Sequence, residues 1–146
     1  MLAARSPLEC QVYLALHPCA CGCADFPWTS HELSTEDTST YSGACPACGT
    51  PRSVTFRVPR GLVPGFGGAE PSQIITAGDF LDLAKRAIAH DDLGFAQAAL
   101  EEVLKFQTQD AVRAEARALL TACNRAKLAG LASAKPAPAG ARVESR

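Results

Sequence analysis

Closely spaced cysteines constrain this chain of 146 residues more than any other feature. Seven are present, at positions 10, 19, 21, 23, 45, 48 and 123. An odd number fits a fully paired disulfide framework poorly. Thiolates at such short spacing are typical of a metal site, in which they converge on one ion. We therefore predict that the cysteines near residue 20 form one half of a metal site and that the pair within CPACG, residues 45 to 49, forms the other half.

Glycines indicate which of the crowded thiols are the ligands. Gly22 follows Cys21 in the same way that Gly49 follows Cys48, and glycine allows the close backbone approach that a metal-binding turn requires. The parallel favours Cys19 and Cys21 in the first half of the site. The predicted ligands of one structural Zn²⁺ are Cys19, Cys21, Cys45 and Cys48.

Alternatives to the first ligand pair stay open at this point. Cys21 and Cys23 form a competing pair, and His17 is a rival ligand. Because His17 precedes a proline, we expect it to cap the end of the preceding helix instead. Two cysteines lie in apolar helical patterns, where we expect free structural thiols: Cys10 and Cys123.

The segments around the site read as short strands. Residues 24–34 place Phe26 and Trp28 on one side of a predicted strand, and residues 35–39 form a polar turn. In residues 52–59, Val54 and Phe56 alternate with polar residues, which is the clearest strand pattern. Together with the residues that lead into Cys45, these segments predict a three-stranded antiparallel sheet. So small a sheet buries little core, so we expect the ion to help hold it.

Two cysteine knuckles that bracket a hairpin resemble a zinc ribbon over residues 17–58, which implies a structural metal. The stretch HPCACG resembles the Cys-x-Cys-Gly opening of SEC-C-type zinc motifs, but the next cysteines follow only at 45 and 48. With RSPLE and EEVLKF, it is also similar to stretches of bacterial zinc-ribbon proteins. That resemblance implies no activity.

Helical signals flank the predicted ribbon on both sides. Ser6, Pro7 and Glu9 predict an N-cap, a first helical position and a capping box, and the helix is expected to end near His17. Alternating apolar residues at 10, 12, 14 and 16 leave a strand as the alternative. Later in the chain, Thr76 and Asp79 predict a second capping box.

Three further helices are predicted by apolar periodicity, the second capped by Asp91 or Asp92 and the third over about residues 110–131. Glu101 and Lys105 are expected to pair on a solvated face. We predict one apolar seam, made by Phe80, Leu83, Ile88, Leu100, Val103, Leu104 and Leu119.

The first two of these helices resemble a tetratricopeptide unit, with apolar residues at the expected positions: Phe80, Leu83, Ala84, Ala96, Leu100 and Val103. The pattern departs at Ala87, where an aromatic residue is expected, and at Thr108, where a proline is expected. One copy cannot form a solenoid, so an ordinary helical hairpin is an equal alternative.

These elements predict an α+β chain, a small three-stranded antiparallel zinc ribbon followed by a three-helix segment. We place the N-terminal helix and zinc ribbon in residues 1–58, a Gly- and Pro-rich linker in 59–73, the helical segment in 74–132 and a disordered tail in 133–146.

Charge and histidine placement narrow the function. Fourteen basic and fifteen acidic side chains give a net charge of −1 without a basic stripe, so we expect no nucleic-acid partner. No apolar run approaches the roughly 20 residues of a membrane span. The start of the chain reads as mature sequence, so we expect a cytoplasmic protein with reduced thiols. The three histidines are scattered and show no catalytic constellation, so we expect no enzyme.

The resulting prediction is a small protein-interaction module, an adaptor or an immunity-type protein, with a protein partner. A nucleic-acid-binding ribbon is one alternative, which would use Trp28, Phe56, Arg52, Arg57 and Arg60 to stack and neutralise single strands. A thiol redox sensor is another, since the thiols are crowded.

Overall fold

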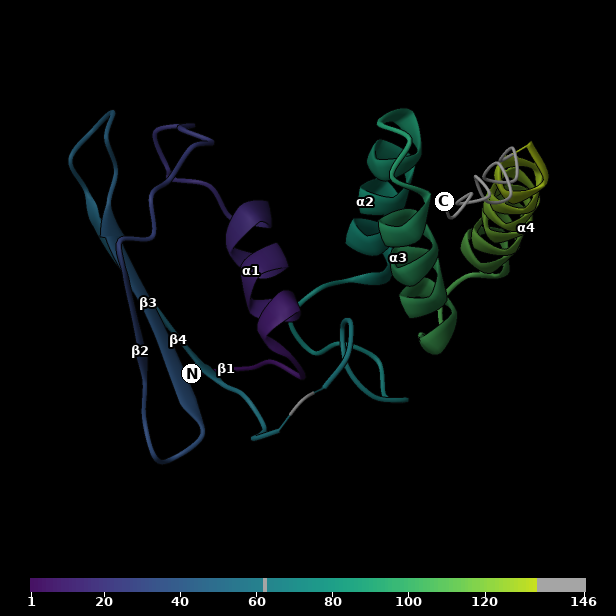
Figure 1. The fold of residues 1–146 in the computed structure, drawn as a ribbon. Coiled ribbons are helices and arrows are strands. Elements are labelled where there is room, and N and C mark those ends of the chain that lie inside the picture. The colour runs from purple at the N-terminus through teal and green to yellow at the C-terminus, as the bar shows by residue number, and fades with distance from the viewer. Residues whose placement is uncertain (62, 134–146) are drawn as a thin grey trace, which may run out of the picture.

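A computed structural model describes residues 1–61 and 63–133 and shows an α+β fold (Figure 1). Its elements are β1 (Leu2–Ala3), α1 (Pro7–Leu16), β2 (Ser30–Leu33), β3 (Thr38–Ala44), β4 (Pro51–Arg57), α2 (Ala77–Ala89), α3 (Leu93–Lys105) and α4 (Asp110–Ser133). The predicted fold class is therefore confirmed. Of the tail predicted over residues 133–146, residue 133 belongs to α4, and residues 134–146 lie outside the described residues.

The sheet is four-stranded and mixed in the described part of the chain, with the order β1-β4-β3-β2. β3 pairs antiparallel with both β2 and β4, as predicted, with Tyr41 opposite His31 on one side and Val54 on the other. β1 pairs parallel with β4, placing Leu2 beside Phe56. The prediction of three antiparallel strands was wrong here because β1 has only two residues, too few to show an alternating pattern.

One face of the sheet carries apolar side chains and packs on α1. Tyr41 and Phe56 are buried there with Cys10 and Leu14 of α1. The opposite face is lined by hydroxyl pairs such as Thr40 and Thr55, whose oxygens lie 2.9 Å apart. This alternation is what a sheet with one covered face requires.

Helix α1 lies between the sheet and the later helices (Figure 1). Its Ser6 cap accepts a hydrogen bond from the Glu9 N–H, and the helix ends with His17 as its cap. Cys10 belongs to the core shared with the sheet, whereas Val12 belongs to the core shared with α2 and α3. Because both sides of α1 are buried, its sequence alternates like a strand although it is helical. The predicted helix is confirmed and the strand alternative was wrong.

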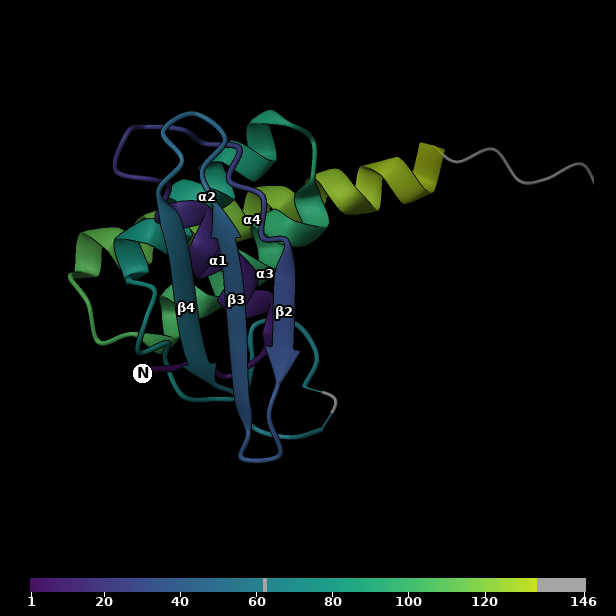
Figure 2. The same ribbon diagram turned by 90° about the vertical axis from the view of Figure 1, so that its left-hand side faces the viewer.

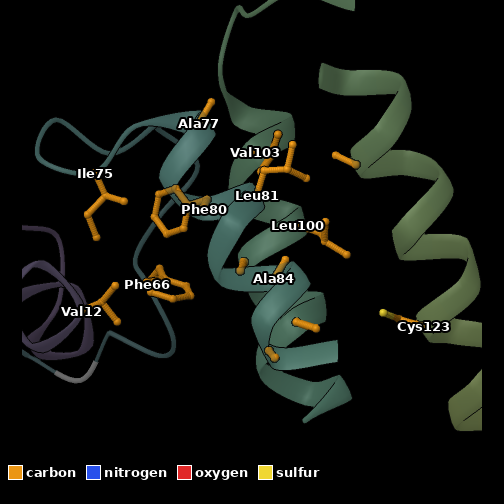
Figure 3. Packing of buried hydrophobic residues seen from close by; sticks show 14 residues of the cluster. Val12, Phe66, Ile75, Ala77, Phe80, Leu81, Ala84, Leu100, Val103 and Cys123 are labelled. Atoms are coloured by element: carbon orange, nitrogen blue, oxygen red, sulfur yellow. The ribbon is translucent and has the colours of Figure 1, made fainter. Parts of the chain in front are cut away.

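The predicted seam of the later helices is present. Phe80, Leu100 and Val103 are fully buried (Figure 3). The half-buried remainder packs against them: Leu83, Ile88, Leu104 and Leu119. The capping box of Thr76 and Asp79 and the cap at Asp92 are formed as predicted.

The segment at residues 59–73 contains no helix or strand among its described positions, but it contributes to the core. Phe66 is 3% exposed and packs edge-on against Phe80 and Phe95, with ring centroids 5.1 and 5.7 Å apart. Val12 and Ile75 belong to the same apolar cluster (Figure 3). Val12 of α1 and Phe66 of this loop therefore connect the later helices to the part of the fold that carries the sheet.

A nearly buried cluster of charges also joins α1 to α3. Arg5 Nη2 lies 2.8 Å from a carboxylate oxygen of Glu9 and 2.8 Å from one of Glu102, and Lys105 also pairs with Glu102. We call Arg5, Glu9, Glu102 and Lys105 the Arg5 cluster. The predicted pair of Glu101 with Lys105 was wrong: Lys105 turns toward Glu102, and Glu101 accepts from Gln97 instead. Glu9 likewise accepts from the Arg5 N–H rather than completing a capping box.

Over the described positions, no helix has both the length and the apolar character needed to span a membrane.

Candidate metal centre

Four cysteine sulfurs converge at one end of the sheet. The Sγ atoms of Cys19, Cys21, Cys45 and Cys48 all lie within 4.8 Å of one another. The Sγ atoms of Cys19 and Cys48 are 3.6 Å apart, as are those of Cys21 and Cys45. A tetrahedron with zinc–sulfur bonds of about 2.3 Å has edges of about 3.8 Å. The spacing of the sulfurs thus fits a divalent ion bound by four thiolates.

The structure brings together all four residues predicted as ligands. Cys23 is not a member of the cluster, although its thiol lies near enough to Cys45 to interact with it. The His17 ring stacks on Tyr13 at 4.0 Å, and its Nδ1 lies 2.8 Å from the Tyr13 carbonyl oxygen. Cys10 and Cys123 are free and buried away from the cluster, in the two apolar cores.

Each half of the site is closed by a backbone hydrogen bond from a glycine, over three residues in the first half and four in the second. The Gly22 N–H donates to the Cys19 carbonyl at 2.8 Å, and the Gly49 N–H donates to the Cys45 carbonyl at 2.8 Å. Both glycines have positive φ angles, 87° and 74°, which other residues adopt only with strain. The glycine that follows each pair is therefore needed to turn the chain so that both thiols face the same point.

Backbone donors around the second half favour thiolates. The N–H of Cys48, assisted by that of Ala47, lowers the pKa of the Cys45 thiol to about 6. The hydroxyl of Thr50, 3.1 Å from the Cys48 sulfur, lowers the pKa of Cys48. Thiolates are the form that binds metal ions, so this half of the site is prepared for a cation.

In the first half of the site, the neighbouring sulfurs raise the pKa of a thiol. The N–H of Cys23 acts to lower the pKa of the Cys21 thiol, but hydrogen bonds to the neighbouring sulfurs of Cys45 and Cys48 outweigh it and raise the pKa to about 12. Four thiolates this close repel one another, so some must keep their protons. A divalent cation can replace those protons and allow all four to ionise.

Arg52 of β4 anchors the first half of the site to the sheet. Its Nη2 donates to the His17 carbonyl at 2.7 Å. Its guanidinium lies over the rings of Phe26 and Trp28, 4.8 and 5.1 Å from their centroids. Sequence reasoning missed this arrangement, because nothing in the spacing of these residues indicates that they meet.

The same contacts correct the predicted strand over residues 24–34. β2 begins only at Ser30, and Phe26 and Trp28 precede it in a loop. Pro27 cannot donate a ladder hydrogen bond, and its carbonyl oxygen lies so close to β3 that a Cβ on Gly43 would meet it at 2.1 Å. This loop therefore packs across the end of β3 instead of pairing with it.

Comparisons of the chain with protein families, with curated proteins and with solved structures find no match.

Proposed function

We propose that one zinc ion bound by Cys19, Cys21, Cys45 and Cys48 holds this fold together and that the chain is a small protein-interaction module. The observation that carries the metal assignment is the convergence of four thiol sulfurs within 4.8 Å. Tetrahedral sites of four sulfurs are typical of zinc or of iron–sulfur centres. We favour zinc because the two cysteine pairs, each followed by a glycine, resemble those of a structural zinc ribbon.

A structural rather than a catalytic ion is supported by the ligand set. Four thiolates complete a tetrahedral shell and leave no position for a water or a substrate, which catalytic zinc keeps open. The proposal therefore assigns no reaction to the chain. The cellular role that we propose is that of an adaptor or immunity-type protein in the cytoplasm, where thiols stay reduced and able to bind the ion.

The nucleic-acid alternative loses support from the placement of its residues. Phe56 is fully buried beneath α1, so it cannot stack on a base. Arg52 is engaged by two rings and a carbonyl, and Arg60 pairs with Asp37. With a net charge of −1, few phosphates could be neutralised. A redox sensor would need the four thiols free, whereas their tetrahedral spacing favours a bound ion.

The metal assignment is tested on full-length protein purified under reducing conditions. Elemental analysis should give one zinc and no iron per chain. Cys48→Ser should lose the ion, whereas Cys23→Ser, which alters a nearby thiol outside the cluster, should keep it. Fresh protein without metal, with Cys45 and Cys48 joined as a disulfide, would contradict the assignment, as would zinc loss in Cys23→Ser with retention in Cys19→Ser.

A further inference from the structure

Strand β2 forms a free edge of the sheet. In the strand order β1-β4-β3-β2 it has one neighbour, β3, and Figure 2 shows it at the margin. All four of its residues are exposed, and Leu33 is 77% exposed. An edge strand presents backbone donors and acceptors that can pair with another chain. The edge carries no proline or lysine, which commonly block such pairing.

The face of the sheet that packs on α1 extends to β2, but α1 does not cover it there. His31 lies opposite Tyr41, and Leu33 lies opposite Ser39. Cross-strand partners share a face, and Tyr41 and Phe56, the latter opposite Ser39, are both buried against α1. His31 and Leu33 therefore point to the α1 side, where their exposure shows that the helix does not cover them. A groove thus runs between α1 and β2.

One end of this groove is an aromatic cavity of about 380 Å³. Its walls include Leu14 and Ala15 of α1, the Phe26 and Trp28 rings, and the stacked pair of His31 on Tyr41, whose centroids are 4.2 Å apart. None of its lining residues is an aspartate, glutamate, lysine or arginine. A volume in this range with apolar walls and few polar groups is typical of a binding pocket.

The other end is a second cavity of about 290 Å³, whose apolar walls are Leu33, Pro7 and Val58. Its rim also holds Asp37 and Arg60, which pair with each other. Ser39 also lines it and lies 2.6 Å from His31 Nε2, so the hydrogen-bonded pair separates the two cavities. His31 and Leu33 are two residues apart on one strand, about 7 Å. Side chains two residues apart on an added strand have the same spacing.

We propose that this groove binds an extended segment of a protein partner, which pairs with β2 and inserts an uncharged aromatic side chain into the cavity at Trp28. A second apolar side chain, two residues away in the segment, fills the cavity at Leu33. Main-chain pairing supplies affinity in this mode, and the pockets supply specificity. The absence of charge from the aromatic lining selects against charged side chains, since a carboxylate or ammonium group would lose its hydration without a partner. The inference rests on the proposed interaction role and names its surface.

The probe is a displayed library of random nine-residue peptides, selected on the zinc-loaded full chain and then synthesised. Enriched peptides should share an aromatic residue with an apolar residue two positions away. In the complex, the Trp28 indole N–H resonance should shift, and amides of β2 should exchange more slowly with solvent. Trp28 is the sole tryptophan of the chain, so its indole resonance is unambiguous.

Ala15→Glu places a carboxylate at the mouth of the aromatic cavity. It should weaken peptide binding by about tenfold or more, which corresponds to a loss of at least about 1.4 kcal/mol of binding free energy. Ala24→Glu does the same from the facing loop. Ala118→Glu is the matched control, an exposed alanine of α4 far along the chain, and should leave binding unchanged. Zinc content and helical circular dichroism check that each variant is folded.

The outcomes separate this inference from the proposed function. Peptides that bind equally well to Ala15→Glu and Ala24→Glu would overturn the groove while leaving an interaction role in place. Selection of charged peptides, or binding of a free aromatic amide without any peptide pairing to β2, would also overturn it. A folded, zinc-loaded chain that enriches no peptide would contradict the groove, and a chain that holds no zinc yet enriches these peptides would contradict the metal proposal alone.

Discussion

Replacing Arg5 with methionine should destabilise the chain by about 3–5 kcal/mol, because it removes the cation from a nearly buried cluster. The side chain of Arg5 is 15% exposed, whereas those of Glu9 and Glu102 are 0% and 5% exposed. Burial alone would lower the pKa of the Arg5 guanidinium, but its bonds to the two carboxylates outweigh burial and raise the pKa. The two carboxylates thus favour the charged form of the Arg5 guanidinium at this position.

The expected magnitude follows from what the substitution leaves behind. Glu102 keeps Lys105 as a partner. The Glu9 carboxylate keeps a hydrogen bond from the backbone N–H of residue 5. It loses Arg5, which is its sole cationic partner among the described residues. A buried charge without a counter-charge is the costly result, whereas the methionine stem preserves most of the apolar packing of the arginine stem.

Urea unfolding at constant free zinc measures the effect. Helical circular dichroism follows α1–α4, and Trp28 fluorescence follows the loop beside the sheet, so coincident transitions also test whether the chain unfolds as one unit. Lys85→Met is the control, since its partner Glu115 and Lys85 are both 46% exposed and exposed pairs contribute little. Its transition should remain close to that of the unchanged chain.

A second substitution separates the lost charge from lost packing. Glu9→Gln removes the charge that Arg5→Met leaves uncompensated, so the double variant should be more stable than Arg5→Met alone. If Arg5→Met unfolds at the same urea concentration as Lys85→Met, or if Glu9→Gln destabilises it further, the assignment of a buried, mutually compensating cluster is wrong.

Three further predictions concern the metal, the loop and the helices. Acidification should weaken zinc binding, because protons compete for the thiolates; a chelator assay that shows unchanged affinity at lower pH would exclude the thiolate site. Gly43→Ala should displace the loop, since the new Cβ would meet the Pro27 oxygen at 2.1 Å, and a red-shifted Trp28 emission measures it; an unshifted spectrum would contradict the packing. Residues 72–146 alone should be molten or aggregated for want of α1 and Phe66, and a cooperatively melting helical monomer would refute this.

The ligand candidates were accessible from the sequence because their signals are local. Each thiol pair and its glycine lie within four or five consecutive residues, and the turn that aligns them is set by the backbone of those residues. The capping box of Thr76 and Asp79 and the apolar seam are similarly local or periodic, whereas the box predicted at Glu9 is not formed because Glu9 accepts from Arg5. Such features can be predicted from a short stretch of sequence without knowledge of the rest of the chain.

The remaining features depend on contacts that no local pattern encodes. β1 pairs with β4 over two residues, and Arg5 meets Glu102 across 97 positions. The loop before β2 was misread because its alternating rings resemble a strand, whereas Arg52 and the close approach at Gly43 decide its path. Only the assembled structure shows that α1 is buried on both sides.

The metal centre and the proposed groove share one structural support. The first cysteine turn ends at Gly22, and the chain then builds the aromatic wall at Phe26 and Trp28 before it enters β2. Arg52 holds both the start of that turn and the rings of that wall. Loss of the ion would free the turn, and with it the wall of the cavity, even though the Arg5 cluster still joins α1 to α3. Peptide binding at β2 should therefore require zinc, which gives a structural ion a direct consequence for recognition.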